Sequence, residues 1–384
     1  MLRRALTLSL CLFANQAGTL VLSPILVSVA REFAVSTAAA GQLRSVSGAV
    51  AGVTALGVAP VAARIGLRRL LLAGLALLAG AASLSAAAPS FAVLAVAQAI
   101  LGVAVAVLLS GAVAGVTAWI APGRRADALS IVFGGQAAAW LLGMPIVGLV
   151  GDVSWRLAWI VLPLGSAAIA LVLAVGLPDV RLPASSAGGG MRLVLRDRVV
   201  AAQAAGELLA FSAWTGMLVY SGALLIESYG ISLPVTGLLL GLVFVAYFPS
   251  SLLFRRWIDR APGRLLVTLA LAAACVAALI GLVRPTVWVS VLLLAAYVFL
   301  NAGRTISGSA FGLDAAPGMA VTAMGVRASA TQFGYLVGGA LGGIALLLGG
   351  YPALGLTFAA LYVLAIVPHA LLVLVAPRAV GLGS

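Results

Sequence analysis

The residues that could do chemistry in this sequence are a few charged side chains inside otherwise apolar segments. Glu207, Arg304 and Arg327 each stand about seven or eight residues from the nearer polar loop, which is roughly 10–12 Å at 1.5 Å per helical residue. An ionisable group at the centre of a bilayer costs about 2.5–3.5 kcal/mol, so it needs a partner, water or a function. Their equal depth predicts that the three side chains meet.

Glu207 is the candidate site of proton uptake and release, with Arg304 or Arg327 as its partner in the ionised form. Exclusion of water disfavours a charged carboxylate, whereas a nearby guanidinium favours it. A conformational change that alters which of these two effects dominates can therefore change the protonation state of Glu207. A fixed ion pair that only specifies helix packing is the alternative.

A second set of candidates consists of polar and aromatic side chains spaced along the apolar segments. Amides interspersed with aromatics suit contact with a broad amphipathic ligand, although each one could instead be an interhelical hydrogen bond or core packing. Arg44 is either an interfacial residue with its guanidinium in water or a gate or ligand contact. The candidate ligand-contacting residues are Asn15, Gln16, Arg44, Gln98, Gln136, Trp140, Trp214, Tyr220, Asn301 and Gln332.

The elements that must carry these residues are membrane-spanning helices. Mean hydropathy is +1.22, 64% of residues are hydrophobic and 8% are charged, which is too apolar for a water-soluble core. A span needs about 20 apolar residues. The first run continues to Val29 and so predicts a retained span rather than a cleaved signal peptide. The twelve qualifying segments are 5–29, 41–62, 69–88, 91–118, 127–150, 157–177, 199–226, 234–254, 265–283, 287–311, 320–348 and 353–376.

The predicted fold is an all-α polytopic membrane protein with two pseudo-symmetric six-helix bundles, residues 1–177 and 199–384. A linker at 178–198, with four arginines and a Ser-Ser-Ala-Gly-Gly-Gly core, joins them. All 22 basic residues are arginine, and 16 of them fall in the linker or in loops on the side of the termini. The positive-inside rule therefore places the termini and the linker in the cytoplasm.

The two halves of the sequence repeat each other at an offset of 195 residues. Ala121-Pro122-Gly123 corresponds to Ala316-Pro317-Gly318, Gly143 to Gly338, and Gly148 to Gly343. Several matches at one offset, between segments that occupy the same place in the order of each half, indicate an internal duplication. Such repeats are typical of transporters that bind their substrate near the middle of the membrane.

Two motifs link the sequence to a known family. Residues 59–68 supply Arg64, Gly66 and Arg68 in the spacing of a Gly-x-Leu-Ala-Asp-Arg-x-Gly-Arg-Arg loop, and Gly143-x-Pro145 with Gly148 forms a Gly-x-Pro signature. With these motifs the chain resembles the major facilitator superfamily over essentially its whole length, and more narrowly its twelve-helix drug:proton antiporter and small-solute exporter branch. The resemblance implies that the glycines let the fifth predicted segment, 127–150, contact the eighth, 234–254, and that this contact seals one face of the protein. Ordinary small-residue packing is the alternative.

The sequence also departs from the family pattern. Ala63 stands where the loop motif has its aspartate, and Gln98 where a buried arginine is expected. The equivalent loop in the second half keeps an acid, Asp259, followed by Arg260. Asp259 either favours the positive end of a nearby helix or is a solvated loop acid. Loss of the acid at Ala63 predicts that the corresponding contact is weakened or replaced.

The remaining reactive side chains give little signal. The single histidine, His369, lies in the last span, which is peripheral in the resembled family, so a structural or lipid-facing role is expected rather than a proton relay. Cys11 and Cys275 lie far apart and predict neither a disulfide nor a metal site. No nucleophile elbow, phosphate loop, HExxH motif or carboxylate pair indicates an enzyme.

The leading hypothesis is a proton-coupled exporter. Arg44, Arg304 and Arg327 against Glu207 leave a positive surplus inside the membrane, which favours a neutral or anionic ligand over a cation. We therefore expect a small amphipathic organic substrate, protons and membrane lipid as partners, no nucleic acid, no cofactor or metal, and a monomer in a bacterial cytoplasmic (inner) membrane. An uptake carrier or facilitator of the same fold and a non-transporting membrane scaffold or sensor are the alternatives.

Overall fold

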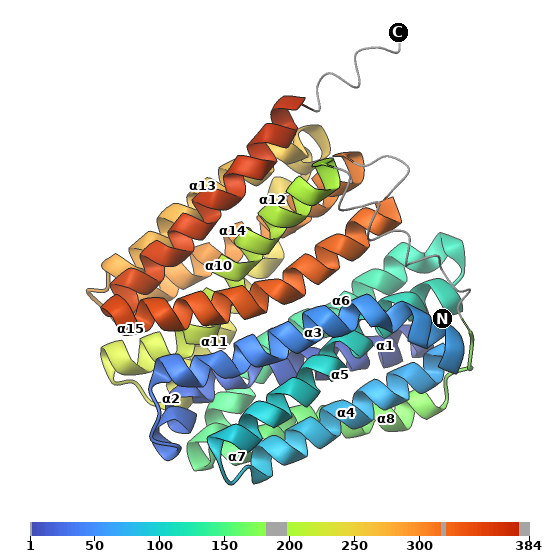
Figure 1. Ribbon diagram of the computed structural model, residues 1–384, viewed down its shortest axis with the longest axis horizontal. Helices are drawn as coiled ribbons and strands as arrows, with labels where there is room; N and C mark the ends of the chain where they lie inside the picture. Colours follow the sequence, from blue (N-terminus) through green and yellow to red (C-terminus); the bar gives the residue numbers. More distant parts are fainter. Residues whose placement is uncertain (1, 182–197, 316–319, 376–384) are drawn as a thin grey trace. The chain divides into compact units, whose positions relative to one another are not determined.

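The computed structural model describes residues 2–181, 198–315 and 320–375, and within these ranges the regular structure is helical throughout (Figure 1). Ten stretches of the described chain are long and apolar enough to cross a membrane. One of them, Ser329–Ala370, covers most of the last two predicted spans, and α3 (Thr37–Ile65) corresponds to the second predicted span, which brings the total to twelve. The all-α, twelve-helix fold predicted from the sequence is confirmed.

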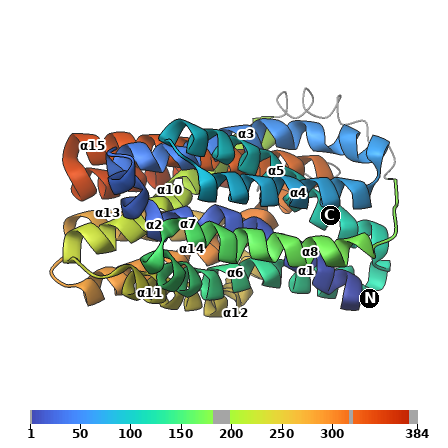
Figure 2. The same cartoon turned by 90° about the horizontal axis from the view of Figure 1, so that it is seen from below.

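The first six predicted spans correspond closely to the observed helices. The first span is α1 (Leu2–Leu20) followed by α2 (Leu22–Glu32), and the sixth is α7 (Trp155–Trp159), a π-helical turn at Ile160–Leu164 that contains Pro163, and α8 (Gly165–Val175). Figure 2 shows α7 and α8 in succession. The helices between them are α3, α4 (Leu67–Ala87), α5 (Phe91–Trp119) and α6 (Arg125–Val153), with the short 3-10 turn η1 (Pro122–Arg124) before α6.

The second six spans also follow the prediction. The elements are α10 (Arg198–Tyr229), α11 (Leu233–Val245), α12 (Tyr247–Arg260), α13 (Pro262–Leu282), α14 (Val287–Ala315) and α15 (Ala320–Val375). The eighth span is α11 followed by α12. The 56 residues of α15 form two helical limbs, because the backbone leaves the helical region at Gly349 and Gly350. Gly350 has a φ of 61°, a conformation that favours glycine.

The helices begin where side chains can satisfy their free amide groups. Ser36 accepts a hydrogen bond from the amide of Ala39 at the start of α3, Ser90 from that of Val93 at α5, and Ser154 from that of Arg156 at α7. The exposed surface is apolar: the exposed fractions of Val172, Leu292 and Leu348 are 73%, 70% and 82%. Several polar side chains within the helices, such as Asn15, Gln98 and Glu207, are buried instead, which is the distribution expected of an integral membrane protein.

The chain divides into two compact units. One comprises Met1–Ala187 with Val219–Gly241, and the other Gly188–Leu218 with Leu242–Ser384. In the first, α5 packs against α3 and α4, and α6 against α1. In the second, α13 packs against α14 and α15. The division cuts α10 and α11, so each of these helices belongs to both units. The bundle limits predicted at the linker 178–198 stay a prediction.

Candidate functional site

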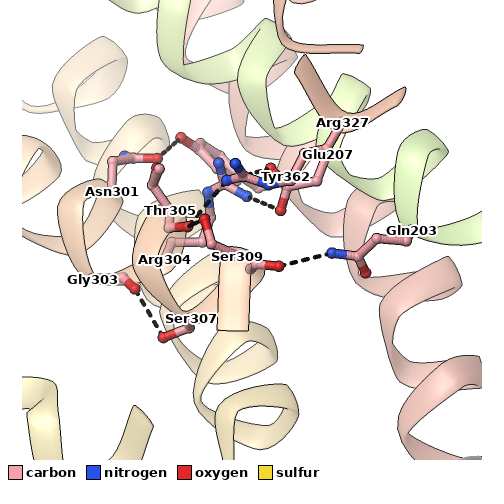
Figure 3. A network of polar contacts seen from close by, with 11 residues as sticks. Gln203, Glu207, Asn301, Gly303, Arg304, Thr305, Ser307, Ser309, Arg327 and Tyr362 are labelled. Atoms are coloured by element: carbon pink, nitrogen blue, oxygen red, sulfur yellow. Dashed lines mark hydrogen bonds and ion pairs between the residues drawn. The ribbon is translucent and has the colours of Figure 1, made fainter. Parts of the chain in front are cut away.

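Glu207, Arg304 and Arg327 form one buried cluster in the second unit (Figure 3). Glu207 comes from α10, Arg304 from α14 and Arg327 from the first limb of α15. Nη1 of Arg304 lies 3.4 Å from Oε1 of Glu207, and Nη2 of Arg327 lies 3.4 Å from Oε2. The side chains of Glu207 and Arg304 are 0% exposed and that of Arg327 is 11% exposed. The sequence left open which arginine pairs with Glu207, and the structure shows that both do.

Small residues make room for this cluster between the helices. A Cβ atom on Gly308 of α14 would overlap Oε1 of Glu207, so the carboxylate can approach α14 only because position 308 is glycine. Arg304 lies over the ring of Phe211 from α10, with its Cζ 5.4 Å from the ring centroid. This contact offsets part of the cost of burying the guanidinium but provides it with no hydrogen-bond acceptor.

The hydrogen bonding of the cluster is incomplete. Nη2 of Arg327 also donates to the carbonyl oxygen of Thr305 at 3.0 Å, but its Nε has no hydrogen-bond partner among the described residues. Nε and Nη2 of Arg304 have none either. With two guanidinium groups and one carboxylate, the three side chains carry one positive charge in excess. Buried polar groups are usually satisfied, so an incomplete set indicates a site that works by changing partners.

His369 lies beside this cluster, so of the two expected roles, structural or lipid-facing, its burial excludes the lipid-facing one. Its side chain is buried, with 1% of the residue exposed. A Cβ atom on Gly206 would lie 2.5 Å from Nε2 and Cε1 of the imidazole, so the second limb of α15 contacts α10 one residue before Glu207. Neither ring nitrogen makes a well-formed hydrogen bond within the described chain, although the carbonyl oxygen of Ala365 is close enough to interact.

A tyrosine network that the sequence reasoning missed lies next to the same cluster. The hydroxyl of Tyr362 donates to Oδ1 of Asn301 and lies 3.2 Å from the hydroxyl of Tyr297. Tyr297 in turn donates to the carbonyl oxygen of Ala213 at 2.8 Å, and its ring lies 5.6 Å from that of Trp214. Asn301 and Trp214, predicted as ligand contacts, therefore belong to one network in the second unit.

The predicted ligand contacts of the first half are mostly buried, in pairs. Nε2 of Gln136 donates to Oε1 of Gln16 at 2.8 Å, and Nε2 of Gln98 lies 3.5 Å from the hydroxyl of Ser85. Arg44 is 3% exposed and donates to the Ser47 hydroxyl at 2.9 Å, so it is not an interfacial side chain that reaches water. The other candidates are Asn15, Tyr220 and, in the second unit, Gln332, which are buried, and Trp140, which is partly buried.

The Gly-x-Pro motif lies at a close contact between α6 and α11, inside the first unit. A Cβ atom on Gly148 would lie 2.8 Å from the Cα of Gly237. A Cβ atom on Gly241 would lie 2.8 Å from the ring of Pro145. Gly143 instead packs near Leu20 of α1. Backbones this close require glycine on both helices.

The loop between α3 and α4 has a carboxylate from an unexpected source. Asp179, just after α8, lies 3.4 Å from Nε of Arg69, and a Cβ atom on Gly66 would overlap its Oδ1. The amide of Leu67 donates to the carbonyl oxygen of Val180 at 2.9 Å. Gly66 has a φ of 89°, which also favours glycine.

The remaining loop residues add less. Arg68 donates to the carbonyl oxygen of Leu177 at 3.5 Å, whereas Arg64 and Arg260 are exposed. The side chain of Asp259 lies outside the described part of the chain, as do residues 316–318 of the repeated tripeptide.

A second ion pair provides a contrast to the Glu207 cluster. Glu32 at the end of α2 accepts hydrogen bonds from Nε1 of Trp155 and Nη2 of Arg156. Nη1 of Arg156 donates to the carbonyl oxygens of Ala86 and Ala88 at 3.0 and 2.8 Å, at the end of α4. The side chains of Arg156 and Glu32 are 30% and 42% exposed.

Comparison with known proteins shows which sequences and structures this chain resembles. The sequence profile of the Major Facilitator Superfamily matches residues 8–311. No curated protein matches the chain in sequence. Among solved structures, a D-xylose–proton symporter (15% identity, 96% of this chain and 97% of that one) and a nucleoside transporter (15%, 96% and 98%) each give a TM-score of 0.78. A human organic anion transporter gives a TM-score of 0.72 at 17% identity, over 96% and 99% of the two chains. At these identities the likeness shows the fold.

Proposed function

Because the chain belongs to the Major Facilitator Superfamily, we propose that it is a secondary active transporter in which Glu207 binds and releases the coupling proton. The observation that carries the proposal is a fully buried carboxylate between two guanidinium groups on two other helices. A displacement of the helices that removes both Arg304 and Arg327 from Glu207 leaves the carboxylate in an apolar environment, where the neutral form is favoured. Return of the arginines favours release of the proton.

The direction of transport is the finer part of the proposal. The Gly-x-Pro motif and the contact of α6 with α11 support export of a small amphipathic, neutral or anionic compound in exchange for protons. The second candidate is uptake, supported by Ala63 and Gln98, which depart from the antiporter pattern. The distribution of the arginines supports a cytoplasmic membrane location with both termini in the cytoplasm. We propose that the monomer is the functional unit.

The test begins with a growth screen of expressing cells against a panel of small organic compounds, which identifies a transported compound. That compound is then followed in proteoliposomes, with and without a pH gradient. The wild-type chain should move it against its gradient when the pH gradient is imposed, and Glu207→Gln should keep exchange at equal pH but lose gradient-driven transport. Unchanged gradient-driven transport by Glu207→Gln removes this residue from the mechanism. The direction of proton movement separates export from uptake.

A further inference from the structure

Arg304 is a fully buried cation with one of its binding edges unused. It is 0% exposed and reaches Glu207 through Nη1. Nε and Nη2 have no hydrogen-bond partner within the described residues (Figure 3). These two nitrogens lie on the same edge of a guanidinium and form the fork that binds both oxygens of a carboxylate side by side. The free atoms are therefore the pair suited to an oxyanion.

Burying the Nε–Nη2 edge of Arg304 without a hydrogen-bond acceptor costs free energy. A buried donor without an acceptor costs more than the same donor in water, and more still when it is charged. Cζ of Arg304 lies over the ring of Phe211, 5.4 Å from its centroid, and this ring has no oxygen or nitrogen atom that could accept a hydrogen bond. The cluster also has one positive charge in excess, because Glu207 is shared between Arg304 and Arg327. One monoanion would supply both the missing acceptors and the missing charge.

We propose that the Nε–Nη2 edge of Arg304 binds the carboxylate of a small organic anion. This inference names the substrate class of the proposed transporter and rests on that proposed function for its role in transport. The two parallel N–H groups of this edge match the two oxygen atoms of one carboxylate. The neighbouring aromatic side chains, Phe211 and the tilted pair Tyr297–Trp214, would provide an apolar surface for the rest of the ligand.

The position of Glu207 sets how a proton affects this site. An ionised Glu207 holds Nη1 of Arg304 and repels a second carboxylate, whereas a neutral side chain does not repel it. The anion and the proton therefore bind together rather than in competition. Binding together favours movement of both in the same direction, and so favours the second candidate, uptake, where the proton gradient points inward.

Binding of benzoate to the purified full-length chain tests the proposal by isothermal titration calorimetry at constant pH and ionic strength. Benzamide, which has the same shape without the charge, controls for apolar binding. Arg304→Lys keeps the positive charge beside Glu207 but loses the fork, and should weaken benzoate binding by about tenfold or more. Glu207→Gln removes the repulsion and should tighten it severalfold. Arg256→Lys, at an exposed position on α12, is the matched control and should bind as the wild type does.

The opposite signs expected for the two cluster variants separate binding from misfolding. A misfolded chain loses affinity, so tighter binding by Glu207→Gln cannot arise from damage. Three results would each overturn the proposal. The first is that benzoate binds neither the wild type nor Glu207→Gln saturably, and the second is that benzamide binds as tightly as benzoate. The third is that Arg304→Lys binds benzoate like the wild type while eluting as a monodisperse species. Failure here leaves the proton site at Glu207 intact, because gradient-driven transport by Glu207→Gln is measured separately.

Discussion

Two ion clusters in this chain use the same residue types and differ in how completely they are satisfied. Glu32 and Arg156 are partly exposed and saturated: the carboxylate accepts from an arginine and a tryptophan, and the arginine also binds two carbonyl oxygens. Glu207, Arg304 and Arg327 are buried and under-satisfied, with 3.4 Å contacts and unused donors.

The difference indicates different roles. The Glu32–Arg156 cluster joins the ends of α2 and α4 to the start of α7, and the carboxylate and the guanidinium each have more than one partner there. An under-satisfied cluster gains interactions when a proton, a ligand or a moving helix arrives. We therefore expect variants at Glu32 and Arg156 to affect stability alone, and variants at the Glu207 cluster to affect stability and coupling together.

The largest effect is expected from Arg304→Leu. Removal of one partner of a buried carboxylate typically costs about 3–5 kcal/mol, because the carboxylate loses an attractive interaction that offset its burial. Arg327 still pairs with Glu207, so the lower part of that range applies. Thermal unfolding of the purified chain in detergent measures the loss. A stability equal to that of the wild type would show that Arg304 contributes little to the charge balance of the site.

A smaller effect is expected from Gly308→Ala. The new methyl group would overlap Oε1 of Glu207 and separate the carboxylate from α14, at a cost of about 1–3 kcal/mol. Gradient-driven transport should fall with it. Gly312→Ala, one turn further along α14, is the matched control, because its methyl group would meet only the flexible end of Gln203 at 3.3 Å. Equal behaviour of the two variants in unfolding and transport would contradict this account.

At the saturated cluster, Glu32→Gln should cost about 1 kcal/mol or less, in the range of exposed ion pairs. The amide can still accept from Trp155, so much of the local hydrogen bonding is kept. Proton coupling should not change. Proteoliposome transport with a pH gradient, compared directly with Glu207→Gln, measures the contrast. Loss of coupling in Glu32→Gln would remove the distinction drawn between the two clusters.

The smallest change in stability is expected from His369→Leu. Neither imidazole nitrogen has a well-formed hydrogen bond, so replacement by an apolar side chain should alter stability by less than about 1 kcal/mol. The dependence of transport on pH should nevertheless change, because His369 is close enough to Glu207 to interact electrostatically. A stable variant with the wild-type pH profile would limit His369 to packing.

The sequence was sufficient for the helices and for singling out the charged residues within them. Apolar segments of membrane length predict spans whatever their neighbours, and Glu207, Arg304 and Arg327 are visible because charges are rare in such segments. The sequence did not predict which face of each helix points toward the interior of the protein. A helix that is apolar all round has no polar side to indicate its orientation. That both arginines, rather than one of them, contact Glu207 therefore came only from the structure.

His369 shows what a closer reading of the sequence could have found. Phe358, Tyr362, Ala365 and His369 are all buried and lie on one stripe of the second limb of α15, at spacings of four, three and four residues. A stripe that includes a tyrosine and a histidine in the last span predicts an inward-facing polar surface. Asp179 could not be found in this way, because it approaches Gly66 from more than a hundred residues away in the sequence.

The kink at Gly349 and Gly350 has a consequence for how the Glu207 cluster changes state. Only these two residues join the limb that carries Arg327 to the limb that carries His369, so the two limbs form a helical hairpin with a very short turn. Arg327 and His369, which both lie near the Glu207 carboxylate, are therefore carried by one hairpin. Withdrawal of the arginine should carry the imidazole along, and a longer insertion at the bend should let the two depart independently.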